Sequence, residues 1–140
     1  MTVNREHLLL PVNREHLLLF TAALRSGEFE QGRGRLRVGK GDDATYCCLG
    51  VATIIAHRNG CPISDEELED ILLKDSNLPD AVMEFYGLDS PNPGLKRLVP
   101  DPTCDRPMTS AIGANDDHGW TFDVIADAFE RTYLSDEAGE

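Results

Sequence analysis

Two adjacent thiols are the residues of this 140-residue chain best suited to chemistry. Cys47 and Cys48 open its most apolar stretch, which has the pattern of a helix. At the amino terminus of a helix, the dipole and the unpaired backbone amides stabilise a thiolate, and a histidine base would complete a nucleophilic pair. Cys48 is therefore the candidate nucleophile and His118 the candidate base. Asp116 or Asp117 would orient the imidazole.

A family resemblance points to the same thiol. The run Tyr46-Cys47-Cys48-Leu49-Gly50-Val51 resembles the segment that opens the catalytic helix of NlpC/P60-type papain-like hydrolases, with Cys48 in the nucleophile position. The resemblance implies a cysteine-dependent hydrolase or transferase. A second interpretation is that both thiols are small buried core side chains, as free cysteines commonly are. We favour the core interpretation.

A glycine-rich loop carries the second candidate group, the cations Arg33, Arg35, Arg37 and Lys40. From Gly34 to Lys40 the spacing is that of a phosphate-binding loop, G-x-x-x-x-G-K. Such a loop needs a hydroxyl residue next to hold the metal, but the next residue here is glycine. We therefore predict no nucleotide hydrolysis, and a loop whose cations could bind a small anionic ligand.

Metal and nucleic-acid sites are not predicted. His57 and Cys61 are the one pair with the spacing of a zinc knuckle, and structural zinc sites usually need two such pairs. The segment that begins at Gly119 resembles the start of a helix-turn-helix. An acidic tail follows where a basic recognition helix is required. We expect no cofactor, no metal and no nucleic acid.

Charge is divided unevenly along the chain. Residues 1–40 hold seven Lys and Arg against four Asp and Glu, whereas residues 41–140 hold six against twenty-one, and the net charge is -12. Such an acidic body repels nucleic acid and anionic membranes and favours a basic protein partner. Arg5, Glu6, Arg14 and Glu15 lie among the leucines of the amino terminus, so no uninterrupted apolar run there is long enough for a signal peptide or a membrane span. We therefore expect a cytoplasmic protein with free thiols.

An internal repeat marks the start of the predicted domain. The run Val3–Leu10 recurs as Val12–Leu19, nine residues later, with Pro11 between the copies. Nine residues turn a helix through about 900°, so the two copies would face opposite sides of one continuous helix. We therefore predict a flexible extension over residues 1–11, one globular domain over 12–134 and a polar tail over 135–140.

The domain is predicted to be α+β and mainly helical, with four or five helices around a buried central helix at about residues 46–58. Capping residues Asn13, Ser64 and Thr121 begin three others. The expected flanking helices are 14–26, 65–74, 79–86 and 122–134. A minor ribbon is expected at 35–38, with a second segment at 109–113. Residues 88–107 are expected to form a loop, 108–114 a helical turn or short strand, and 115–120 a turn.

Several short sequence motifs together resemble those of a family of small uncharacterised accessory proteins of actinobacterial tailed phages and prophages. They are Ala23-Leu24-Arg25-Ser26-Gly27, Gln31-Gly32, Cys47-Cys48-Leu49-Gly50-Val51, Leu78-Pro79 and Asn115-Asp116. The resemblance implies a non-virion accessory product of no settled activity. Two functions stay open. The favoured one is a non-catalytic host-interaction protein that binds a basic partner through its acidic body or a small anion through its basic loop, and the alternative is the Cys48 enzyme.

Overall fold

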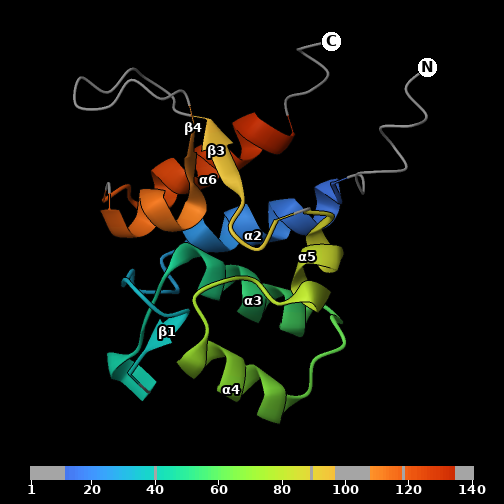
Figure 1. Cartoon of the computed structure of the whole chain (residues 1–140), viewed down its shortest axis with the longest axis vertical. Coiled ribbons are helices and arrows are strands. Elements are labelled where there is room, and N and C mark those ends of the chain that lie inside the picture. The colour runs from blue at the N-terminus through green and yellow to red at the C-terminus, as the bar shows by residue number, and fades with distance from the viewer. Residues whose placement is uncertain (1–11, 40, 89, 97–107, 118, 135–140) are drawn as a thin grey trace.

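The computed structural model describes residues 12–39, 41–88, 90–96, 108–117 and 119–134. Its helices stack in layers (Figure 1): α2 lies between α6 and α3, and α4 lies on the far side of α3. The helices are α2 (Arg14–Ser26), α3 (Cys48–Arg58), α4 (Asp65–Lys74), α5 (Asp80–Tyr86) and α6 (Phe122–Tyr133). The predicted α+β, mainly helical single domain is confirmed.

Helix α2 begins and ends where its local signals predict. The Asn13 side chain accepts a hydrogen bond of 3.0 Å from the backbone N–H of His16, and Gly27 ends the helix at φ 83°. Leu17, Phe20 and Leu24, expected on one face, are all buried. That face packs against α3 and α6, so α2 joins the two halves of the core.

Helix α3 is the predicted central helix, and it begins at Cys48, two residues later than expected. Thr45 and Tyr46 form strand β2 instead, because their backbone pairs with strand β1 (Arg37–Val38). Most of α3 is buried, including Val51, and Cys47 is its N-cap. A helix that is apolar on most faces lies in the core, as its pattern indicated.

The remaining helices also follow their capping residues. Ser64 and Glu67 form the predicted reciprocal capping box at the start of α4, and the Thr121 side chain accepts from the backbone N–H of Val124 at the start of α6. Pro79 is the N-cap of α5, and Gly87 ends that helix at φ 74°. Tyr86 at the end of α5 is buried, and its hydroxyl donates to the carbonyl oxygen of Ala52 in α3.

The β structure consists of two separate antiparallel ribbons. One pairs β1 with β2 (Thr45–Tyr46), and the other pairs β3 (Gly94–Lys96) with β4 (Met108–Ser110). The expectation of a loop throughout residues 88–107 is therefore wrong at β3. Local sequence could not reveal this strand, because its hydrogen bonds go to a partner more than ten residues away.

Two further expectations change near the carboxyl end. The strand expected at 109–113 ends at Ser110, and the chain then turns into a helical segment whose residues 113–117 form a π-helix, η2. The turn expected at 115–120 is thus partly helical. Asn115 lies in η2, is 1% exposed, and makes side-chain hydrogen bonds to half-buried residues. The 1–11 extension and the 135–140 tail lie outside the described residues.

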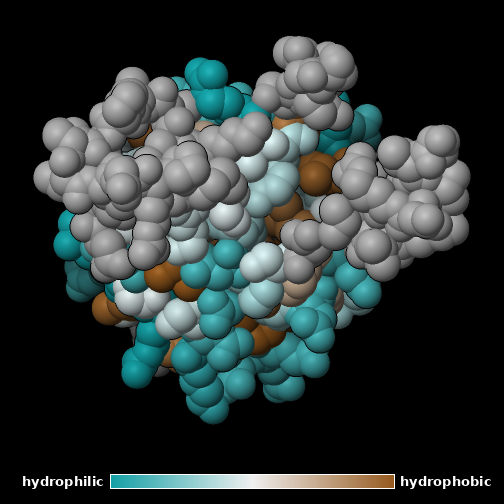
Figure 2. Space-filling view, turned by 45° about the horizontal axis from the view of Figure 1, so that its top comes forward, coloured by the Kyte–Doolittle hydropathy of each residue, from teal (hydrophilic) through white to brown (hydrophobic). Residues whose placement is uncertain are grey.

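The surface view in Figure 2 shows hydrophilic residues over much of one face, with hydrophobic residues scattered among them. The larger hydrophobic side chains that the described residues expose are Leu18, Leu19 and Val38. None of the described helices combines the length and apolar character that crossing a membrane requires.

Candidate functional site

The two thiols lie at the amino end of α3, as predicted, but inside the core. Cys47 is 1% exposed and Cys48 is fully buried. The sulfur of Cys48 lies 3.6 Å from the carbonyl oxygen of Ala111, to which the thiol donates a weak hydrogen bond. A substrate atom could reach Cys48 only if this packing opened.

Burial also sets the protonation of these thiols. Burial is the largest cause that raises the pKa of Cys47 to about 11 and the pKa of Cys48 well above its ordinary value, and the negative charge of Asp116 contributes to both shifts. Hydrogen bonds from backbone amides near the start of α3 act in the opposite direction, but desolvation is the larger effect. An activated nucleophile needs a lowered pKa, so this environment favours the core interpretation of the thiols.

The structure places Asp116 close enough to both thiols to affect their pKa values, so one predicted partner of Cys48 is nearby. Its carboxylate accepts a hydrogen bond of 3.1 Å from the backbone N–H of Gly34 and one of 2.8 Å from the side-chain amide of Asn115. Asp116 therefore holds the loop. His118, the predicted base, lies outside the described residues.

Asn115 is the centre of a polar network that sequence reasoning missed. Its amide nitrogen donates to the carbonyl oxygen of Gly32 at 2.7 Å, and its oxygen accepts from the side chain of Gln31 at 2.9 Å. The Gln31 amide also donates to the carbonyl oxygen of Trp120. These bonds fix the start of the glycine-rich loop against η2. The motifs Gln31-Gly32 and Asn115-Asp116 are present in the sequence, but no local pattern indicates that they lie in contact.

The predicted cation set of the loop divides into three kinds. Arg37 is largely buried and forms a two-pronged ion pair with Glu69 of α4, at 2.7 and 3.0 Å. Arg33 and Arg35 are exposed, and neither side chain forms a hydrogen bond or ion pair with the described chain. Lys40 lies outside the described residues. The available cations are thus Arg33 and Arg35, and the Arg33 guanidinium lies beside Gly119.

An acidic hollow beside this loop was not predicted. It has a volume of about 560 Å³, within the range of ligand pockets. Its lining residues are Gly27, Glu28, Phe29, Glu30, Gly41, Asp42, Ala44, Tyr46 and Arg58. Three carboxylates and one guanidinium give the lining a net charge of -2. We call this site the acidic hollow.

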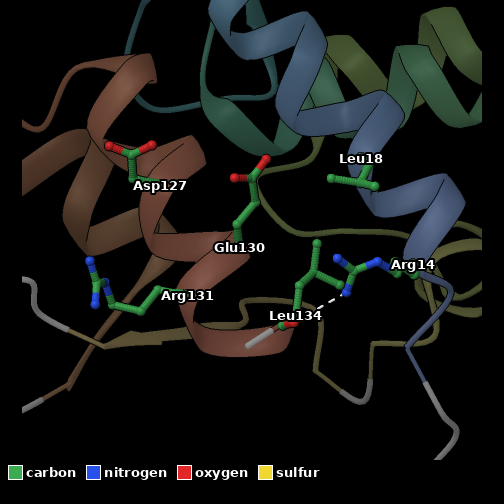
Figure 3. A pocket seen from close by; sticks show the side chains of 6 residues that line it. All are labelled: Arg14, Leu18, Asp127, Glu130, Arg131 and Leu134. Carbon is green, nitrogen blue, oxygen red and sulfur yellow. Dashed lines mark hydrogen bonds between the residues drawn. The ribbon is translucent and has the colours of Figure 1, made fainter. Parts of the chain in front are cut away.

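A second hollow of about 550 Å³ lies between α2 and α6 (Figure 3). Its charges already have partners within the protein. Asp127 and Glu130 both bind Arg25 of α2, and the Arg14 guanidinium donates to the carbonyl oxygen of Leu134. These contacts clamp α6 to α2, so the polar lining of this hollow serves the helix packing. Its floor includes the half-exposed Leu18.

Metal ligands are not gathered anywhere in the described ranges: no group of three or more His, Cys, Asp or Glu could hold an ion there. His57, one half of the knuckle pair considered above, instead lies 2.9 Å from the carboxylate of Asp65.

The geometry defines a small helical protein with sealed thiols and an acidic surface hollow, and comparison with known proteins gives its family. The chain belongs to the family described as a domain of unknown function, DUF8296, which matches residues 13–133. The match begins at Asn13, the cap of α2. It shows neither a phage origin nor a similarity to hydrolases. No curated protein and no solved structure matches the chain.

Proposed function

We propose that this protein is a non-catalytic accessory protein of the kind encoded by actinobacterial tailed phages and prophages, and that it binds a basic protein partner of the host cytoplasm through its acidic body. The net charge of -12 supports this proposal, since a surface of one sign steers partners of the opposite sign. The buried thiols Cys47, Cys48 and Cys61 form no disulfide, which suits a reducing compartment.

The observation that carries the proposal is how the ion pairs are distributed. Arg25, Arg37 and Arg58 all bind carboxylates of the same chain. Many exposed carboxylates still have no cationic partner in the described chain: Glu30, Asp42, Asp43, Glu66, Asp80 and Asp123. An excess of unpaired negative charge on ordered elements is what a basic partner can complement.

A second candidate function rests on Arg33 and Arg35. Both are exposed, both lack an ionic partner in the described ranges, and the network around Asn115 holds the backbone between them. Guanidinium groups bind phosphate and carboxylate well. The loop therefore supports binding of a small anionic ligand, with Lys40 as the third predicted contact.

The Cys48 enzyme is the alternative that the geometry favours least. A nucleophile at Cys48 would need an exposed thiolate, whereas this thiol is buried with a raised pKa. Iodoacetamide labelling of the native protein at neutral pH decides the point. We expect Cys47 and Cys48 to react only after unfolding. Rapid labelling of Cys48 in the native protein would instead favour the enzyme hypothesis.

Peptide binding tests the proposed function. Fluorescence anisotropy would compare a labelled basic peptide with its citrulline and glutamine counterpart and with an acidic peptide, all of one length, at low ionic strength. We expect the basic peptide alone to bind. The double variant Arg33→Gln/Arg35→Gln should bind it at least as well, since it makes the protein more acidic. A folded protein that binds no basic peptide, or prefers the acidic one, would overturn the proposal.

A further inference from the structure

The acidic hollow has ordered walls. On one side, the carbonyl oxygen of Glu30 accepts a hydrogen bond of 2.8 Å from the N–H of Tyr46, which fixes Glu30 beside β2. On the other, the N–H of Ala44 donates to the carbonyl oxygen of Gly41 across the 3-10 turn that carries Asp42. Because the backbone is already held in place, binding of a ligand would have to order only the side chains of Glu30 and Asp42.

Three apolar or aromatic residues, Phe29, Ala44 and Tyr46, also line the hollow. Phe29 and Ala44 are buried, and the half-buried Tyr46 meets the Phe29 ring nearly at a right angle, with ring centres 5.2 Å apart. The Tyr46 hydroxyl makes no hydrogen bond to any described residue. The hollow thus combines a mostly polar, negatively charged lining with the half-buried ring of Tyr46.

One arginine of this chain, Arg58, already binds a carboxylate and an aromatic ring that line the hollow. Arg58 donates two hydrogen bonds to the carboxylate of Glu28, at 2.6 and 3.2 Å, and its guanidinium carbon lies 5.4 Å from the centre of the Phe29 ring. This pairing combines a forked ion pair with a cation–π contact. It raises the pKa of Arg58 and lowers the pKa of Glu28.

Two further carboxylates, those of Glu30 and Asp42, line the hollow. Glu30 and Asp42 are exposed, and neither carboxylate has a cationic partner within the described chain. Arg58 neutralises Glu28, so the net charge of -2 resides on these two side chains. A planar guanidinium with several fixed donors fits two carboxylates better than a compact ammonium, and it is more weakly hydrated.

We propose that the acidic hollow is an arginine-recognition site, in which Glu30 and Asp42 bind the guanidinium of an arginine presented by the partner and Tyr46 contacts its stem. This inference rests on the proposed function and deepens it, because it names the residue type read and the site that reads it. Lysine would bind at the same place more weakly.

The test is a titration of ¹⁵N-labelled protein with a short peptide that carries a single arginine, and with matched peptides that carry lysine or citrulline there. We expect the amide signals of Glu30, Gly41 and Tyr46 to shift with arginine, to shift less with lysine, and to stay unchanged with the uncharged citrulline. Equal affinity for lysine and arginine, or shifts centred elsewhere, would overturn the arginine site.

A charge-matched pair of variants completes the experiment. Glu30→Gln/Asp42→Asn removes the charge of the two hollow carboxylates that Arg58 does not neutralise and keeps nearly the same side-chain shape, and Glu66→Gln/Asp123→Asn removes two exposed charges on α4 and α6. For an arginine-rich peptide, we expect the first variant to lose at least about tenfold in affinity and the second to change less than about twofold. Equal losses of affinity in both variants would refute the hollow as the arginine site but leave the acidic body as the binding surface. No binding by the native protein would refute both.

Discussion

The side-chain amide of Asn115 donates a hydrogen bond of 2.7 Å to the carbonyl oxygen of Gly32, and so ties η2 to the start of the glycine-rich loop. The two residues are far apart in the sequence and come together next to the sealed thiols. The Asn115 side chain is buried and meets both Gln31 and Asp116. The backbone at the start of the loop that carries Arg33 and Arg35 is therefore held in place.

Removal of this amide should destabilise the fold. Asn115→Ala removes the donor to the half-buried Gly32 carbonyl and one of the two acceptors of the Gln31 amide. An unsatisfied buried group costs about 1–3 kcal/mol, so we expect the free energy of unfolding, measured by urea denaturation, to fall by about 1–2 kcal/mol. The control Asn77→Ala removes an exposed amide that has no side-chain hydrogen bond to a described residue, and should change the free energy of unfolding by less than about 0.5 kcal/mol. Equal effects would show that the network contributes nothing.

Gly50 should not tolerate alanine, although it lies in the middle of a helix. Helix propensity alone predicts that Gly50→Ala stabilises α3 by about 1 kcal/mol. A Cβ at this position would overlap the carbonyl oxygen of Leu36, which is backbone and cannot move aside. We expect a loss of about 1–3 kcal/mol or more in the free energy of unfolding. A rise in the melting temperature would contradict this close packing.

Two neighbouring acids of α4 should differ in their importance. Glu69 pairs with Arg37, whose side chain is only 10% exposed, whereas Asp70 pairs with the exposed Lys74 one turn away. Glu69→Ala leaves a largely buried guanidinium without this partner, and we expect it to cost about 1–2 kcal/mol. Asp70→Ala should cost much less, because water screens this exposed pair. Thermal unfolding of both variants in the same buffer would check this order, and similar values would contradict it.

The buried thiols should make stability fall at alkaline pH. Burial raises the pKa of Cys47 from 9.0 to about 11 in the folded state. Above pH 9 the unfolded chain releases this proton while the folded protein retains it, so the stabilisation present below pH 9 is lost as the pH rises toward 11. The difference of about two pKa units corresponds to at most about 2–3 kcal/mol. Cys47→Ala should flatten the decline between pH 9 and 11, and parallel curves would show an unperturbed thiol.

Most helix boundaries could be predicted because their signals are local. A cap such as Asn13 or Ser64 bonds to an amide three residues away, so the interaction is visible within a short stretch of sequence. The start of α3 was set two residues too early because Tyr46 is apolar enough to extend the helix. Its backbone is instead paired with Arg37.

The candidate sites were harder to predict because they depend on contacts distant in sequence. Arg37 belongs to a basic loop by sequence, yet in space it pairs with Glu69. The acidic hollow is lined by Glu30, which lies beside β2, and by Asp42, which lies in the turn between β1 and β2, and no local pattern links the two. Whether Cys48 is a nucleophile or a core side chain depends on its burial. That burial results from tertiary packing, including the contact of Cys48 with Ala111, which the local sequence does not reveal.

The affinity of the native protein for a basic peptide across a series of ionic strengths tests the central claim most directly. An acidic body that binds a basic partner should lose affinity steadily as salt is raised, because exposed charges are screened over about 10 Å at 0.1 M. We predict tight binding at low salt, a steep decline toward physiological salt, and no binding of the citrulline counterpart at any salt. Affinity that ignores salt, or no binding of the basic peptide at low salt, would contradict the account.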